Sequence, residues 1–234
     1  MGNPEALERI DWLIKQMYKQ ATKRNAAVYG AEAATSGNPF KILVFTMLSA
    51  RTRDETTIKA VEKLFSITKT PKEIRRLGKP KLEKLLYGVG FYRVKTKNLL
   101  KICEFLASKY PNNETKIPDT LDELLKLPGI GRKTANIILS RAFGQVALGV
   151  DVHVHRISNR LGLVKTKKPE ETEQKLMKII PRKYLRTLNR DFVAFGQTVC
   201  TPIKPKCDIC PLNQVCQRIG VKEPCIDCKY GVKS

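Results

Sequence analysis

The chain has 234 residues, enough to bury a hydrophobic core in one large domain or two small ones. Its 44 Lys and Arg residues outnumber 22 Asp and Glu residues, and the formal net charge of +22 favours nucleic acid as the partner over an anionic membrane or a merely solvated basic surface. No apolar run approaches the roughly 20 residues that cross a bilayer, and no secretory signal is recognisable, which excludes membrane-spanning and secreted classes.

Hydrophobic residues recur with a helical period along nearly the whole chain. The first predicted helix carries the stripe Leu7, Ile10, Ile14, Met17 and Ala21, and the next, 39–50, is apolar on most sides. Further helices are predicted around 58–65, from Thr70 with its Pro71 and Glu73 start signals, and near 80–87, 94–109, 121–127, 132–143, 152–161, 169–180 and 183–198. Neither strand-like alternation nor a hairpin dipeptide is found, so the fold class is predicted to be all-α.

A Gly-Ile-Gly turn within residues 127–139 leads directly into a helical pattern. Gly129 and Gly131 would allow positive φ and a close approach of the backbone to a ligand. A capping box is expected at Thr120 and Glu123, at the start of the preceding helix. The unit therefore reads as helix–hairpin–helix, whose exposed backbone N–H groups bind a phosphate oxygen without reading bases.

Lys133 lies two residues inside the second helix of this unit and shares a face with Ile137. We expect it to be half-buried, while Arg132, Asn136 and Ser140 form a polar stripe. Burial and the positive end of the helix dipole both disfavour the ammonium form, and the free amine can attack a sugar carbon. The alternative is an ordinary solvated lysine of a basic DNA-binding hairpin.

Asp151 follows an apolar run and precedes the pattern of residues 152–161, which predicts an N-cap. Backbone N–H groups at such a position keep a carboxylate ionised, and it could stabilise a positively charged sugar or take a proton. The alternative is a plain helix cap. His153 and His155 are two residues apart, so they do not share a metal on a helix, and they are interpreted as packing or phosphate contacts.

Lys133 and Asp151 are separated by 151 − 133 = 18 residues. With the neighbouring motifs Pro-Gly-Ile-Gly-Arg-Lys-Thr-Ala-Asn and Val-Asp-Val-His-Val-His-Arg, this spacing resembles that of the endonuclease III family of DNA glycosylases. The resemblance implies that Lys133 is the nucleophile and that Asp151 assists base departure. The resemblance also implies that the hairpin contacts DNA through Gly129, Gly131, Arg132 and Thr134.

Four of the seven cysteines, Cys200, Cys207, Cys210 and Cys216, have the spacing C-x6-C-x2-C-x5-C. A structural zinc site is the general interpretation of such a set, whereas the family resemblance implies a [4Fe–4S] cluster, and Cys₄ ligation suits either. Lys204 and Lys206 lie inside the first cysteine loop and are candidate phosphate contacts.

The three other cysteines lie outside this set. Cys103 is expected in the core. Cys225 and Cys228 form a C-x-x-C whose role is left open between a metal half-site, a redox pair and no function.

An enzyme that acts on a base must remove the base from the stack and fill the space left behind. The resemblance places an apolar wedge in the turn 87–92, where Phe91 stands in place of the family's usual leucine; its alternative is core packing. Arg93, Lys95 and Lys97 make the helix that follows basic. In the segment 48–54, Arg51 stands where the family has glutamine, and because arginine cannot accept a hydrogen bond, its contact to the opposite base should differ.

The resemblance implies two helical domains with DNA bound in a cleft between them. One domain comprises residues 35–145, with the hairpin unit at about 120–143. The other comprises residues 1–34 plus 146–218 and is followed by a tail, 219–234.

The predicted function is a bifunctional glycosylase and AP lyase that removes oxidised or damaged pyrimidines from double-stranded DNA through a lysine Schiff base. The alternatives are a monofunctional mismatch glycosylase and a non-catalytic docking module. A monomer in the cytoplasm of a prokaryote, associated with the nucleoid, is expected.

Overall fold

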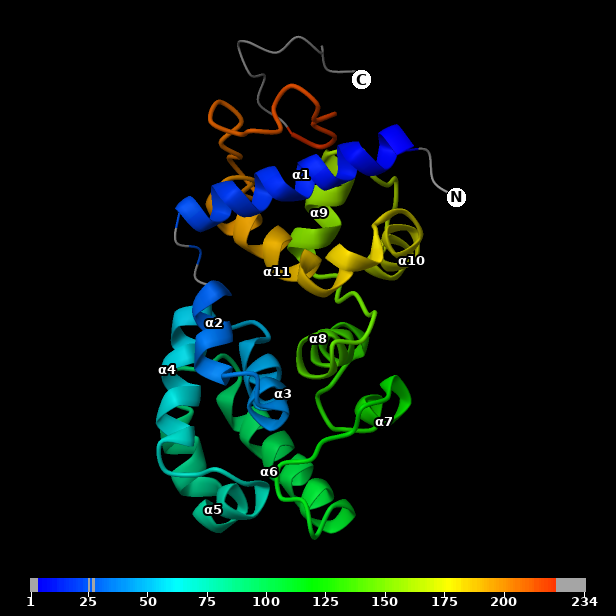
Figure 1. The fold of residues 1–234 in the computed structure, drawn as a ribbon. Coiled ribbons are helices and arrows are strands. Elements are labelled where there is room, and N and C mark those ends of the chain that lie inside the picture. The colour runs from blue at the N-terminus through cyan, green and yellow to red at the C-terminus, as the bar shows by residue number, and fades with distance from the viewer. Residues whose placement is uncertain (1–3, 25, 27, 222–234) are drawn as a thin grey trace. The chain divides into compact units, whose positions relative to one another are not determined.

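A computed structural model describes residues 4–24, 26 and 28–221, and every regular element in these ranges is a helix (Figure 1). The all-α prediction is confirmed. The helices are α1 (Pro4–Lys23), α2 (Val28–Thr35), α3 (Pro39–Ser49), α4 (Asp54–Phe65), α5 (Pro71–Leu85), α6 (Tyr92–Lys109), α7 (Leu121–Leu125), α8 (Arg132–Phe143), α9 (Val152–Arg160), α10 (Pro169–Ile179) and α11 (Arg182–Thr198). None of these described helices is long and apolar enough to cross a membrane.

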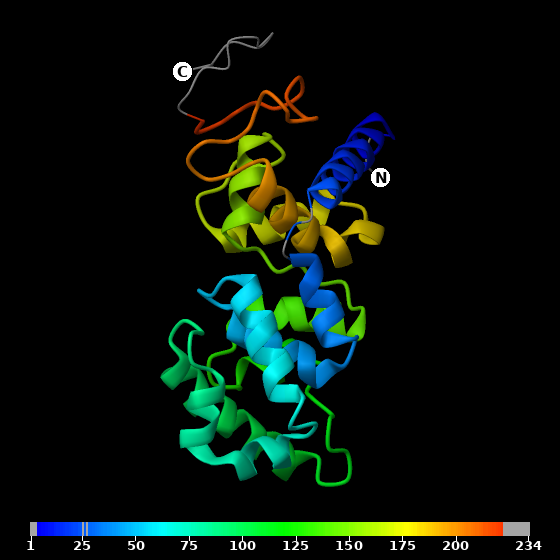
Figure 2. The same cartoon turned by 90° about the vertical axis from the view of Figure 1, so that its left-hand side faces the viewer.

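The chain divides into two compact units, residues 30–147 and residues 1–29 with 148–234. The domain borders expected from the sequence, at 35 and 146, stay a prediction. In Figure 2 the segments of each unit can be followed by their colours. Each unit has its own hydrophobic core, so each is described by itself.

The unit of residues 30–147 is built around α3, whose side chains from Ile42 to Leu48 are all buried. Asn38 caps this helix by accepting a hydrogen bond from the backbone N–H of Lys41 at 3.0 Å, and Pro39 fills the first helical position. α3 packs against α4, α6 and α8, which explains why it is apolar on most sides.

α5 begins as predicted, because the Thr70 hydroxyl accepts a hydrogen bond from the backbone N–H of Glu73 at 3.3 Å. Gly78 interrupts this helix with φ 71°, and Pro80 follows inside it. The two helical patterns predicted from Thr70 and over 80–87 are therefore the two arms of one bent element.

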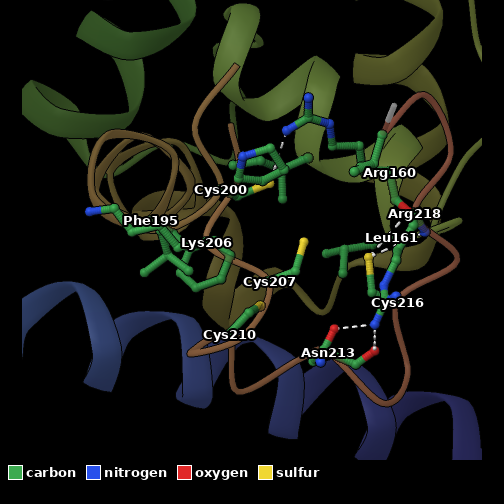
Figure 3. Close-up of a pocket in the computed structure, with 14 residues that line it drawn as sticks. Arg160, Leu161, Phe195, Cys200, Lys206, Cys207, Cys210, Asn213, Cys216 and Arg218 are labelled. Carbon is green, nitrogen blue, oxygen red and sulfur yellow. Dashed lines mark hydrogen bonds between the residues drawn. The ribbon is translucent and has the colours of Figure 1, made fainter. Parts of the chain in front are cut away.

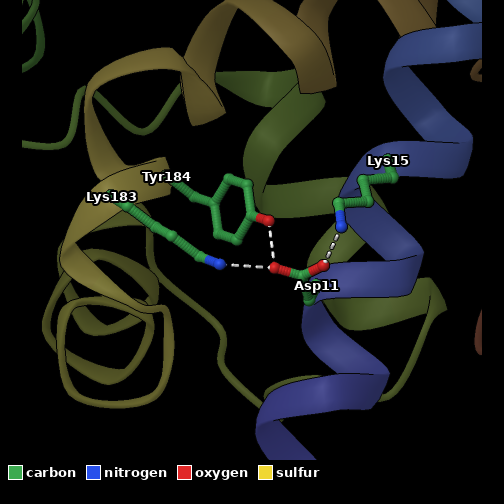
Figure 4. A network of polar contacts seen from close by, with 4 residues as sticks. All are labelled: Asp11, Lys15, Lys183 and Tyr184. Atoms are coloured by element: carbon green, nitrogen blue, oxygen red, sulfur yellow. Dashed lines mark hydrogen bonds and ion pairs between the residues drawn. The ribbon is translucent and has the colours of Figure 1, made fainter.

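The other unit packs α1 along α11, and α11 against α9. Of the predicted stripe on α1, Ile10, Ile14, Met17 and Ala21 are buried, and the side chain of Leu7 lies outside the described residues. Figure 4 shows a polar tie between α1 and α11, in which Lys15 and Lys183 each lie 2.6 Å from an Asp11 carboxylate oxygen and the Tyr184 hydroxyl donates to the same group. These donors hold the pKa of Asp11 well below its usual range.

Two local expectations are corrected by the structure. The sequence analysis predicts no helix over 28–35, where α2 forms; its Ala-rich sequence has little amphipathic pattern. The capping box at Thr120 is wrong: in the described structure no side chain caps α7, and the Glu123 carboxylate accepts from Lys109 of α6.

Candidate active site and cysteine loop

The hairpin between α7 and α8 forms as predicted, with its apolar residues in the core of the unit. Leu124, Leu127 and Ile130 are buried, and backbone bonds of 3.1 Å link Leu127 N–H to Leu124 O and Ile130 N–H to Leu127 O. Gly129 has φ 81°, and a Cβ there would lie 2.6 Å from Nδ2 of Asn98 on α6. Glycine is thus required at 129 by both conformation and space.

Gly131 differs from the expectation of a positive φ. It occupies the N-cap of α8 with φ −94° and ψ 174°, an extended conformation open to any residue. A Cβ at this position would meet nothing within 4 Å, and within the described ranges no side chain caps the helix. The first turn of α8 therefore opens onto exposed space at Gly131, which suits binding of an anion.

Lys133 lies in this first turn, and its side chain is exposed, so the prediction of half-burial is wrong. Asn136 and Ser140 are each only 4% exposed, so the predicted polar stripe is also wrong beyond Arg132, which is exposed. Both predictions fail for the same reason. Side chains in the first turn of α8 extend past the end of the helix into solvent, whereas its later turns are covered by neighbouring residues on the polar side as well as on the apolar side. Thr134 is half-buried.

Asp151 is the N-cap of α9, as predicted. Its Oδ1 accepts hydrogen bonds from the backbone N–H groups of His153 and Val154, both at 2.9 Å. These two donors fix the position of the carboxylate at the start of the helix. The histidines make protein contacts: His153 Nδ1 lies 3.2 Å from Arg156 Nη2, and His155 Nδ1 lies 2.7 Å from the Thr172 hydroxyl.

The four cysteines of the C-terminal loop line one pocket, whose walls include residues of α9 and α11 (Figure 3). Cys200, Cys207, Cys210 and Cys216 are all half-buried and form no disulfide. Burial raises the pKa of Cys210 to about 12 and also raises the pKa of Cys216, so both thiols keep their protons unless a bound metal displaces them. The cysteine loop, residues 200–216, is thus a candidate metal centre, although no group of three or more ligands in the described chain converges on a single ion.

Arginines of α9 hold the cysteine loop, which the sequence analysis did not foresee. Arg160 is 7% exposed and donates to the carbonyls of Thr201 and Pro202, both at 2.7 Å, and to Cys200 Sγ at 3.5 Å. Arg156 donates to the carbonyl of Cys200 at 2.8 Å. The four-residue spacing of these arginines on one helix face was the available signal.

Lys204 and Lys206 are both exposed within the loop, and Lys206 Nζ donates to the carbonyl of Thr198 at 3.1 Å. Cys103 is fully buried, which confirms its place in the core. Cys225 and Cys228 lie outside the described residues.

Two segments expected to enter DNA lie together in the unit of residues 30–147. Phe91 is 60% exposed, so the alternative of core packing is wrong, and it adopts the left-handed conformation with φ 57° just before α6. Arg51, also left-handed with φ 54°, follows the end of α3 and places its guanidinium 5.6 Å from the centre of the Phe91 ring. Lys95, one of the three basic residues noted at the start of α6, is buried.

Comparison with known proteins gives matches over most of the chain. Family models match for the HhH-GPD superfamily of base excision DNA repair proteins over residues 44–182 and for the iron-sulfur binding domain of endonuclease III over residues 200–216. Endonuclease III of Thermotoga maritima is 47% identical over 180 residues, which are 77% of this chain and 83% of that protein. Two solved structures, "Structure of a non-covalent Endonuclease III-DNA Complex" and "Structure of a Trapped Endonuclease III-DNA Covalent Intermediate: Estranged-Adenine Complex", each align with a TM-score of 0.78 at 34% identity, covering 93% of this chain and 97% of theirs.

Proposed function

Since the chain belongs to the endonuclease III family of base excision DNA repair proteins, we propose that it removes damaged pyrimidines from duplex DNA through Lys133 and Asp151. Family membership makes it a bifunctional enzyme, both a DNA glycosylase and an AP lyase. The observation that carries the assignment of residues is the hairpin: an exposed lysine in the first turn of a helix whose N-cap is an open glycine.

In the glycosylase step, the Lys133 amine attacks C1′ of the damaged nucleotide. The bond from C1′ to the base breaks, and its electron pair leaves with the base, which takes up a proton. Positive charge develops on the sugar, and the Asp151 carboxylate, held in place by its two backbone donors, stabilises that charge. Loss of the second amine proton and opening of the ring then give an imine between Lys133 and C1′.

In the lyase step, this imine withdraws electrons from the sugar. A base removes a proton from C2′, a C2′–C3′ double bond forms, and the bond from C3′ to the phosphate oxygen breaks. The strand is cut on the 3′ side of the lesion, and water hydrolyses the imine to release Lys133.

The cysteine loop is proposed to hold a [4Fe–4S] cluster through Cys200, Cys207, Cys210 and Cys216. Four thiols around a cavity fit a polynuclear cluster, whereas a zinc ion needs all four sulfurs about 2.3 Å from one point. When bound, the cluster would offset part of the negative charge of the four thiolates and would order the loop. Lys204 and Lys206 are then presented as phosphate contacts.

Borohydride trapping on a duplex with one abasic site tests the assignment. The wild-type protein should form a covalent adduct, Lys133→Ala should form none, and Asp151→Asn should excise a damaged pyrimidine at least tenfold more slowly while keeping the adduct with a preformed abasic site. Lys126→Ala is the matched control, because it removes one exposed positive charge from the same hairpin. An adduct that persists in Lys133→Ala would assign the nucleophile elsewhere, and absence of any adduct with wild-type protein would refute the bifunctional chemistry.

A further inference from the structure

One buried cation has no place in the mechanism above. Lys95, in the first turn of α6, is only 7% exposed, and among the described residues no carboxylate pairs with it. Burial lowers the pKa of Lys95 to about 8. A lysine is seldom kept in such a position unless the contacts of its ammonium group are needed.

The ammonium group of Lys95 donates to three oxygens, which matches its three hydrogens. The acceptors are the carbonyls of Leu48 at 2.7 Å and Ala50 at 2.5 Å, and the hydroxyl of Thr52 at 3.0 Å. Leu48 and Ala50 lie at the C-terminal end of α3, where the helix dipole is negative and the last carbonyls lack helical partners. The lysine therefore caps α3 from another helix.

The same contacts join two loops that are distant in sequence. The first is the segment 48–54 after α3, and the second is the turn 87–92 before α6. The Thr52 hydroxyl accepts from both Lys95 and the backbone N–H of Gly90, which lies 3.1 Å away. A Cβ on Gly90 would lie 2.4 Å from the carbonyl oxygen of Arg51, so the two backbones approach too closely for any side chain at position 90.

Each of these loops carries one non-glycine residue in the left-handed conformation, and these residues are Arg51 and Phe91. The guanidinium of Arg51 lies over the Phe91 ring, and both side chains are exposed. A non-glycine residue in this conformation is costly and persists where surrounding contacts fix it. The contacts that fix both residues are those of Lys95 and Thr52.

We propose that Lys95 is a positioning residue that clamps the segment 48–54 to the turn 87–92, so that Arg51 and Phe91 enter the DNA as one rigid pair rather than as two independent side chains. This inference rests on the proposed function, because it assigns a task to the two insertion segments. A preassembled pair loses less conformational entropy on entering the stack than two mobile loops. It also makes the preference for the opposite base depend on a residue that touches no DNA.

The geometry separates this role from catalysis. A buried lysine with a lowered pKa is the usual description of an imine-forming nucleophile, yet Lys95 Nζ is enclosed by three acceptors and cannot reach a sugar. The exposed Lys133 remains the proposed nucleophile. Lys95→Met should therefore still give the borohydride adduct on a duplex with a preformed abasic site.

The test is a double-mutant cycle between Lys95→Met and Phe91→Ala, read as kcat/KM for excision of a damaged pyrimidine from duplex DNA. Lys95→Met should lower kcat/KM by about tenfold to a hundredfold, the loss expected for one set of charge-assisted hydrogen bonds, and Phe91→Ala should also lower it because the wedge is lost. In the Phe91→Ala background, Lys95→Met should cost less than about threefold, because the clamp then has no wedge to position. Full additivity would overturn the proposal.

Two milder variants test the clamp even if Lys95→Met does not fold. Thr52→Val removes the hydroxyl that joins the loops and should reproduce the defect, while Thr52→Ser keeps it and should restore activity. Lys101→Met on the exposed side of α6 is the control for loss of a lysine and should be unaffected. Equal activity of the valine and serine variants would refute the clamp, whereas failure of the wild-type protein to excise or to trap would refute the proposed function instead.

Discussion

Gly131→Ser should stabilise the folded protein and lower its affinity for DNA. Gly131 already has the extended N-cap conformation, with φ −94° and ψ 174°, and a new Cβ would meet nothing within 4 Å. Serine fits there without strain, and its hydroxyl can accept from the first N–H groups of α8. Those are the same groups that we assign to a DNA phosphate, so cap and substrate compete for them.

The two effects have different sizes. Serine is better than glycine at an N-cap by a few tenths of a kcal/mol, which corresponds to a rise of about 1 °C in Tm for a unit of this size. Loss of one hydrogen bond to a charged phosphate costs about 1.5–3 kcal/mol, so Kd should rise roughly tenfold or more. The backbone donors carry no formal charge, and the slope of log Kd against log salt should therefore stay unchanged.

Fluorescence anisotropy with a duplex that holds an uncleavable abasic analogue, measured over a salt series, gives both Kd and the slope. Gly131→Ala is the matched control, because it adds the Cβ without an oxygen and separates steric exclusion of the phosphate from competition by a cap. Arg132→Ala should change the slope by about one unit, since it removes a charge. Unchanged affinity in Gly131→Ser together with a raised Tm would show that this helix start does not bind phosphate.

Three further predictions concern other parts of the chain. Gly90→Ala places a Cβ 2.4 Å from the Arg51 carbonyl oxygen, so it should destabilise the fold by about 1–3 kcal/mol, measured by urea unfolding, and an unchanged midpoint would contradict the close approach. Because the pKa of Asp11 is lowered, its stabilising effect is present above about pH 4 and is lost as the pH falls further; the Tm difference between wild type and Asp11→Asn should hold from pH 7 to about pH 5 and shrink below pH 4. Cys210→Ser should lose the bound iron, measured by absorbance near 400 nm and metal analysis, and a zinc content of one per wild-type chain would refute the cluster.

Patterns that depend on neighbouring residues were predictable from the sequence. The Thr70–Pro71 start of α5 and the Asp151 cap of α9 form as expected, because a cap is decided within four residues of chain. The Thr120–Glu123 box has the same local pattern and fails, because Lys109 offers Glu123 a charged partner from another helix. Local signals therefore hold only where no tertiary partner competes for the same side chain.

The candidate site likewise contains residues that the sequence reveals and residues that it does not. The hairpin glycines, the lysine and the four cysteines are all visible as motifs, since chemistry fixes residue type and spacing there. The supports of the site were not visible: Arg160 behind the cysteine loop and Lys95 behind the insertion loops reach over 40 or more residues of chain to their acceptors. Single-sequence patterns carry no information about which helices pack together, so such long-range donors look like ordinary surface cations.

The two lysines show why burial could not be assigned from a helical pattern alone. Lys133 and Lys95 both stand in the first turn of a helix, after a glycine-containing turn. The sequence predicted a half-buried Lys133 and counted Lys95 among the charges of a basic helix. In the structure Lys133 is exposed and Lys95 is buried, since the end of α3 covers the start of α6 and provides oxygens for an ammonium group. Because Lys133 is exposed, the folded protein alone does not dehydrate its amine. In the proposed reaction that task falls to the bound duplex, so activity at Lys133 should depend on how well the clamped loops open the DNA above it.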